Sequence, residues 1–124
     1  RIFKNKWFDK FCKKQKITNE KLIELIKDIK SGFIDVDYGG SLIKQRIARN
    51  NQGKSGGYRS IVLYKFNDKA FFVYGFAKND RDNITKDEEL SFKDLAKEML
   101  DLDEKALDNL VLNKILIEVR YDND

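Results

Sequence analysis

The stretch YRSIVLYKFNDKAFFVYGF, residues 58–76, decides the fold of this chain. Two runs of β-branched and aromatic residues flank the dipeptide Asn67-Asp68. Runs of this composition form strands, and Asn and Asp favour tight turns, so the stretch predicts a β-hairpin. Gly75, near the end of the second run, indicates a bend or a close approach of another segment to the backbone.

A further strand is predicted just before the hairpin, in SLIKQRIA, residues 41–48, where the pattern has a period of two. One face of such a strand carries Ile43 and Ile47, and the opposite face carries Lys44 and Arg46. Two basic residues on one face, about 7 Å apart along the strand, suit an anion such as a phosphate.

Helical periodicity is found on both sides of these strands. Before them, two helices are predicted, one with an apolar stripe expected in the core (Trp7, Phe8, Phe11, Cys12) and one bounded by Thr18 and Gly32. After them, a helix begins at the capping box Thr85–Glu88, followed by a short helix, 104–112, and a last strand, 115–119. This order predicts an α+β fold with a small antiparallel β-sheet flanked by N-terminal and C-terminal helices. Residues 1–124, without proline or repeats, are expected to form a single domain.

The composition limits the chemistry that the chain can perform. It has no histidine and one cysteine, Cys12, so the commonest general base and the usual zinc ligands are missing. Neither a metal nor a cofactor is expected. Four acids that occur in pairs are interpreted as turn and solvent-facing residues: Asp35, Asp37, Asp80 and Asp82. The lone cysteine is typical of the cytoplasm, and no apolar run approaches the roughly 18 residues of a membrane span.

Positive charge is concentrated in one part of the chain. The net charge is +4, yet residues 38–67 hold six basic residues and no acid, whereas residues 101–124 hold three basic residues and seven acids. Such segregation attracts polyanions. The Gly53-Lys54-Ser55 sequence inside the basic stretch is not a nucleotide-binding P-loop, because a strand rather than a helix follows it.

Two further basic residues are expected to join Lys44 and Arg46. Arg59 begins the first strand of the hairpin, and Lys78 follows the bend at Gly75. Aromatic residues alternate with these cations in the sequence: Tyr58, Tyr64, Tyr74 and Phe76. Cations that bind phosphates, together with rings on which bases stack, suit unstacked RNA.

Several segments resemble a known family: KSGGYRSIVLYKFNDKAFFVYGFAKNDRDNI, LAKEML and LIEV are similar to the RelE/ParE superfamily of bacterial type II toxin–antitoxin toxins, in its HigB-like branch. The resemblance runs over nearly the whole chain and implies a small antiparallel sheet flanked by helices. For RelE-like members it implies metal-free cleavage of mRNA in the ribosomal A site. The implied partners are a cognate antitoxin, mRNA and the ribosome.

Carried onto this sequence, the family's motifs match four residues, which are the candidate catalytic residues: Lys44, Arg46, Arg59 and Lys78. Lys44 is the best candidate base, because neighbouring positive charges lower the pKa of an amine. Four residues of the same region are expected to bind RNA: Arg49, Lys54, Tyr58 and Arg81. Two positions depart from the family pattern, since Asn79 replaces a second arginine and Tyr121 lies beyond the last strand.

Two other functions remain open at this point. A ParE-like member would inhibit DNA gyrase by binding, with the same fold and no phosphate chemistry. A degenerate member would retain only the binding of RNA or of its antitoxin. The clustered cations favour cleavage, because a toxin that only binds has no need of a convergent cationic pocket.

Overall fold

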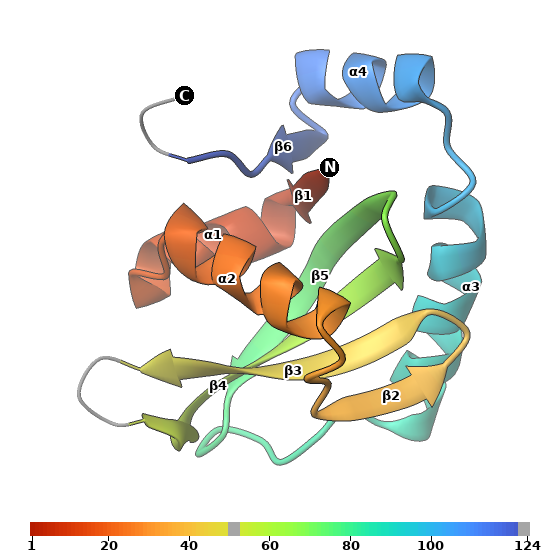
Figure 1. Cartoon of the computed structure of the whole chain (residues 1–124). Helices are drawn as coiled ribbons and strands as arrows, with labels where there is room; N and C mark the ends of the chain where they lie inside the picture. The colour runs from red at the N-terminus through yellow and green to blue at the C-terminus, as the bar shows by residue number, and fades with distance from the viewer. Residues whose placement is uncertain (50–52, 122–124) are drawn as a thin grey trace.

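The computed structural model describes residues 1–49 and 53–121, and the side chains of residues 53–56 lie outside that description. The described residues form four helices and one six-stranded sheet with the order β2-β3-β4-β5-β1-β6 (Figure 1). Along the chain the elements are β1 (Ile2–Asn5), α1 (Lys6–Gln15), α2 (Asn19–Lys30), β2 (Val36–Gly39), β3 (Leu42–Arg49), β4 (Gly53–Lys65), β5 (Lys69–Ala77), α3 (Lys86–Met99), α4 (Glu104–Leu112) and β6 (Leu116–Glu118). The predicted α+β class is confirmed.

The predicted hairpin lies at the centre of the sheet. β4 and β5 pair antiparallel from Tyr58 opposite Ala77 to Lys65 opposite Lys69. Asn67 in the turn has a left-handed backbone, with φ of 56°, which asparagine adopts more readily than most residues. β3 adds to the other side of β4, so the predicted strand at 41–48 is confirmed as well.

Two short strands were not predicted from the sequence. β1 pairs parallel with β5 and antiparallel with β6, while β2 pairs antiparallel with β3. Each has four residues, too few to show an alternating pattern. The expected antiparallel sheet therefore needs one correction, because the β1–β5 pair is parallel.

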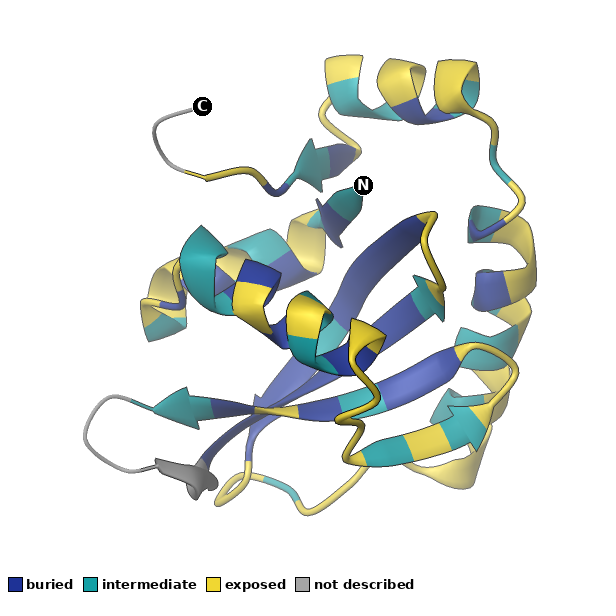
Figure 2. Cartoon of the chain, in the orientation of Figure 1, coloured by how far each residue is buried: buried dark blue, intermediate teal, exposed yellow. Residues whose placement is uncertain are grey.

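Helices cover both faces of the sheet, and the buried residues lie between the layers (Figure 2). On one face, α1 and α2 contribute to an apolar cluster that includes Phe8, Leu22, Ile43, Ile47, Val62 and Phe72. On the other face, α3 and α4 contribute to a second cluster that includes Ile61, Leu63, Phe71, Ala96 and Leu107. Burial of a large apolar side chain stabilises the fold by about 1.5–3 kcal/mol, so these two clusters hold the layers together.

The helix ends follow the signals in the sequence. Thr85 and Glu88 form the predicted capping box of α3, and Thr18 caps α2.

Trp7 was expected in the apolar core stripe of the first helix, but it is 45% exposed. β1 pairs with β5 only as far as Phe72, and beyond that point Trp7 of α1 lies against Tyr74, with ring centroids 4.6 Å apart.

Gly75 is a point of close approach, as its place in the sequence predicts. A Cβ atom built on Gly75 would lie 2.8 Å from Cε2 of Phe11 and 3.1 Å from Cε1 of Phe8. The two rings of α1 therefore rest on the backbone of β5 where only glycine leaves room. This contact sets the distance between the helix and the sheet.

Gly75→Ala tests this contact. We expect the added methyl group to push α1 away from β5 and to lower the free energy of unfolding by about 1–3 kcal/mol, as overpacking of a core does. Chemical denaturation gives the measurement. Phe11→Ala should cost less in the Gly75→Ala background than in the wild type, because it removes the ring that the methyl group meets. Additive effects of the two substitutions would contradict the predicted clash.

Candidate functional site

Three of the four candidate catalytic residues lie on one face of the sheet. Lys44 and Arg46 are two positions apart on β3, and Arg46 is directly opposite Arg59 on β4. Side chains that oppose each other across an antiparallel pair point to the same side, with Cβ atoms roughly 5 Å apart. Ile43 and Ile47 point to the other face, into the cluster below α1 and α2. We call Lys44, Arg46 and Arg59 the cationic cluster.

Arg59 is the most enclosed member of the cationic cluster. The residue is only 7% exposed, and its Nη1 donates a hydrogen bond of 3.3 Å to the carbonyl oxygen of Tyr58. Burial lowers the pKa of Arg59, and so does the charge of Arg46. Because an arginine side chain remains protonated at physiological pH, Arg59 keeps its positive charge although it is enclosed by the protein.

Lys44 is half-buried and is held by a loop. Its Nζ donates to Oδ1 of Asn83 at 3.2 Å. The same oxygen accepts hydrogen bonds from the hydroxyl group of Tyr38, at 2.7 Å, and from the backbone N–H of Ile84, at 2.9 Å. Three donors from three segments thus meet at one amide oxygen, which fixes the position of the Lys44 amine.

The electrostatic surroundings lower the pKa of Lys44. Burial lowers its pKa most, and the positive charge of Arg59 lowers it further. The charge of Arg46 acts in the same direction, whereas the carboxylate of Asp35 opposes the shift. An amine with a lowered pKa is a better proton acceptor near neutral pH than an ordinary lysine.

Asp35 lies in a bend and is exposed, as predicted, and it also binds Arg46. Its Oδ2 accepts a hydrogen bond of 2.6 Å from the backbone N–H of Arg46, and its Oδ1 accepts one of 3.1 Å from Nε of the same residue. The Asp35 side chain is 24% exposed and that of Arg46 is 44% exposed. The contact is therefore open to solvent, and an incoming anion can compete for Arg46.

Lys78 and Arg81 follow β5 but have different surroundings. The backbone N–H of Lys78 donates to the carbonyl oxygen of Gly57 at 3.2 Å, and its side chain is exposed. Arg81 forms a salt bridge with Glu88 and donates to the hydroxyl oxygen of Tyr74 at 3.0 Å. Arg81 thus ties the loop after β5 to the first turn of α3, and its charge is balanced within the protein.

Arg49 and Tyr58, also expected to bind RNA, lie on the face of the sheet opposite the cationic cluster. Tyr58 is only 4% exposed and belongs to the apolar cluster on the opposite face of the sheet. Its hydroxyl group accepts a hydrogen bond from Nε of Arg49 at 2.9 Å and donates one to Gln15 at 3.0 Å. The ring is enclosed, so a base cannot stack on it in this conformation. The side chain of Lys54 lies outside the described residues.

Sequence reasoning did not identify Asn83 and Tyr38 as part of this site. Asn83 lies in a loop and Tyr38 in the four-residue strand β2, and neither segment has a periodic pattern that reveals which way a side chain points. The only signal for Asn83 is its place two residues before the capping box that begins α3. Asp35 was noticed in the sequence, but nothing there indicates that Arg46 is its partner.

The comparison with protein families decides the identity of the fold. Residues 1–119 match the family model described as the RelE toxin of the RelE/RelB toxin–antitoxin system. The chain belongs to the RelE toxin family. A search of curated proteins and a search of solved structures found no match.

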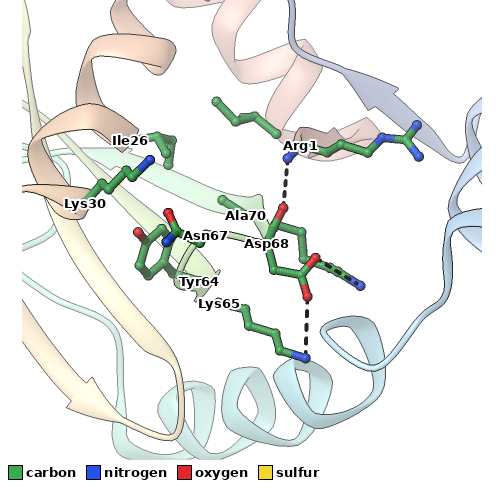
Figure 3. Close-up of a pocket in the computed structure, with 10 residues that line it drawn as sticks. Arg1, Ile26, Lys30, Tyr64, Lys65, Asn67, Asp68 and Ala70 are labelled. Carbon is green, nitrogen blue, oxygen red and sulfur yellow. Dashed lines mark hydrogen bonds and ion pairs between the residues drawn. The ribbon is translucent and has the colours of Figure 1, made fainter.

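The cationic cluster of this RelE-family toxin is distinct from a hollow at the end of the hairpin (Figure 3). That hollow has a volume of about 280 Å³ and is lined in part by Lys30, Tyr64 and Lys65. Asp68 at its rim pairs with Lys65 at 3.5 Å, which offsets some of its positive charge. No cluster of metal-ligating side chains and no helix able to cross a membrane is found in the described part of this toxin.

The pKa of Lys44 provides a test of the cationic cluster. Arg59→Gln removes a positive charge and should raise this pKa, whereas Asp35→Asn removes a negative charge and should lower it further. The measurement is the pH dependence of Lys44 acylation, followed by mass spectrometry of the peptide that contains it. Asp37→Asn is the matched control, because Asp37 bonds to the backbone of Gly39 instead. Shifts of the same sign in both test variants would contradict the described geometry.

The Arg81–Glu88 pair predicts a loss of stability in acid. The hydrogen bond from Arg81, followed by that from the Thr85 backbone, lowers the pKa of Glu88 from 4.5 to about 2. The stabilisation is therefore complete above pH 4.5 and is lost as the pH falls toward 2. Unfolding measured across this range should show a shallower pH dependence for Glu88→Gln. Glu98→Gln, an exposed substitution on the same helix, should retain the wild-type slope.

Proposed function

We propose that this RelE-family toxin is a metal-independent endoribonuclease that cleaves mRNA on the ribosome. The cationic cluster supports the proposal, because two arginine charges stand beside a lysine whose pKa is lowered. Cleavage of a phosphodiester requires both charge stabilisation at the phosphate and proton transfer at the attacking and leaving oxygens. In a chain without histidine, a lysine of this kind is the natural proton acceptor.

In the proposed reaction the RNA supplies its own nucleophile. The neutral amine of Lys44 takes the proton from a 2′-hydroxyl group, and the oxygen attacks the adjacent phosphorus. The bond from phosphorus to the 5′-oxygen breaks, and that oxygen takes up a proton. The products are a 2′,3′-cyclic phosphate and a free 5′-hydroxyl, so neither water nor a metal ion enters the first step.

Three other basic residues assist Lys44 in this proposal. Arg46 and Arg59 bind the non-bridging phosphate oxygens, whose negative charge grows as the nucleophile attacks. Lys78, exposed at the end of β5, orients the phosphate or protonates the leaving oxygen. The scissile phosphate replaces Asp35 as a partner of the Arg46 guanidinium, while the bond from Asp35 to the backbone of Arg46 keeps the strand in place.

The proposed partner is the RelB-type antitoxin that the family description names. An acidic or amphipathic segment of such a protein suits the cationic cluster, which holds three of the six basic residues of the acid-free stretch 38–67. We also assign the chain to the HigB-like branch, on the motifs that it shares with that branch, and treat residues 1–124 as one functional domain.

Single substitutions in the cationic cluster test the proposed catalysis. Lys44→Ala, Arg46→Ala and Arg59→Ala should each slow cleavage by about 10²–10³-fold, as the loss of one group that stabilises the transition state does. Mapping of mRNA ends in a translation reaction measures the rate. Each variant should retain a cooperative melting transition, because its side chain points away from the cluster below α1 and α2.

Two controls separate catalysis from folding and from general charge. Lys65→Ala removes an exposed cation of the same acid-free stretch, far from the cluster along β4, and should leave cleavage unchanged. Ile47→Ala should lower stability by about 2–5 kcal/mol and reduce activity only through unfolding. Wild-type cleavage by all three cluster variants would overturn the assignment. Intact mRNA together with inhibited supercoiling in a gyrase assay would favour the ParE-like alternative instead.

A further inference from the structure

A second hollow lies on the edge of β5. It has a volume of about 400 Å³. Four rings from α1 and β5 form much of its wall: Trp7, Phe11, Tyr74 and Phe76. The hollow exists because β1 pairs with β5 only as far as Phe72, so no strand among the described residues lies beside the last residues of β5 on that side. We call it the aromatic groove.

Trp7 is the most unusual residue of the aromatic groove. It is 45% exposed, although the ring stacks on Phe11 with centroids 5.5 Å apart and contacts Tyr74. A solvent-exposed tryptophan at the opening of a ring-lined hollow is typical of a binding surface rather than of a core.

The rim of the aromatic groove is basic. Lys10 and Lys14 lie four residues apart on α1, on the same side of the helix as Trp7, and both line the groove. Neither forms a salt bridge among the described residues, and like charges at this spacing destabilise a helix slightly. Asp80 is the one acid in the lining, so the rim keeps a net positive charge. This charge is complementary to a phosphate backbone.

The aromatic groove and the cationic cluster share a boundary. Phe76 lines the groove and is directly opposite Arg59 of the cluster. Arg81 also lines the groove, and its Nε donates to the carbonyl oxygen of Asn83, whose side chain binds Lys44. Adjacent strands are about 4.8 Å apart, so a nucleic acid strand at the cluster reaches the groove within a short distance.

From these contacts we infer that the aromatic groove binds an unstacked base of the single-stranded RNA whose phosphate lies at the cationic cluster. Trp7, which is the exposed ring of the four, contacts the base, and Lys10 and Lys14 bind the phosphates beside it. Base–aromatic contacts tolerate any sequence, so the groove holds the strand without reading it. The inference rests on the proposed function for the identity of the strand, but base binding does not require cleavage.

The fluorescence of Trp7 gives a direct test, because Trp7 is the only tryptophan in the chain. The probe is a short single-stranded RNA with 2′-O-methyl groups, which cannot be cleaved through its 2′-hydroxyls. This RNA should quench the emission of the full chain. A strand of equal length with abasic sites should bind through its phosphates but leave the emission unchanged. Equal quenching by the two strands, or none by either, would overturn the inference.

Variants measured by fluorescence anisotropy complete the test. Trp7→Ala should weaken binding of the base-bearing strand by about 5- to 150-fold and leave the abasic strand unaffected, whereas Trp7→Phe should retain most of the affinity. Emission that responds to the antitoxin but not to RNA would make the groove a protein interface and refute the inference. Cleavage without quenching would refute the groove alone, and quenching without cleavage would refute the proposed enzyme alone.

Discussion

Arg46 and Arg59 stand directly opposite each other across β3 and β4, and much of the structure is arranged around this pair. Like charges in this position destabilise a sheet, and the burial of Arg59 adds the cost of lost hydration. Asp35 offsets part of the cost, since it accepts hydrogen bonds from the backbone and the side chain of Arg46. That contact also holds the chain beside β3 just before β2 begins. The need to balance one charge thereby helps to position the edge strand of the sheet.

The same repulsion that costs stability gives Lys44 its chemical character. Burial and the charge of Arg59 lower the pKa of Lys44, so its amine loses its proton more easily. A protein tolerates such a cluster only when the rest of the fold supplies the stability, and here two apolar clusters on opposite faces of the sheet do so. The strand period separates the two tasks, because Ile43 and Ile47 stabilise one face while Lys44 and Arg46 occupy the other.

Much of the fold follows from local patterns in the sequence. The hairpin, the strand at β3 and the capping box at Thr85 depend on short-range chemistry, and each was predicted correctly. β1 and β2 were missed because their pairing partners are distant in sequence and four residues show no period. The cluster on β3 and β4 could be anticipated from the alternation of side chains. The role of Asn83 could not be anticipated, because it depends on the path of a loop. Tyr58 is next to Arg59 in the strand, so the same alternation places it on the opposite face of the sheet.

The loop between β5 and α3 connects the stability of a helix to the position of Lys44. Glu88 accepts a hydrogen bond from the backbone N–H of Thr85, which helps to cap α3, and it also binds the guanidinium of Arg81. Arg81 in turn donates to the carbonyl oxygen of Asn83, whose side chain receives the amine of Lys44. One carboxylate therefore serves both the helix cap and the loop that orients the lysine. The chain of hydrogen bonds that begins at the cap, together with the hydrogen bond from Tyr38 of β2, brings the amide of Asn83 to the cationic cluster.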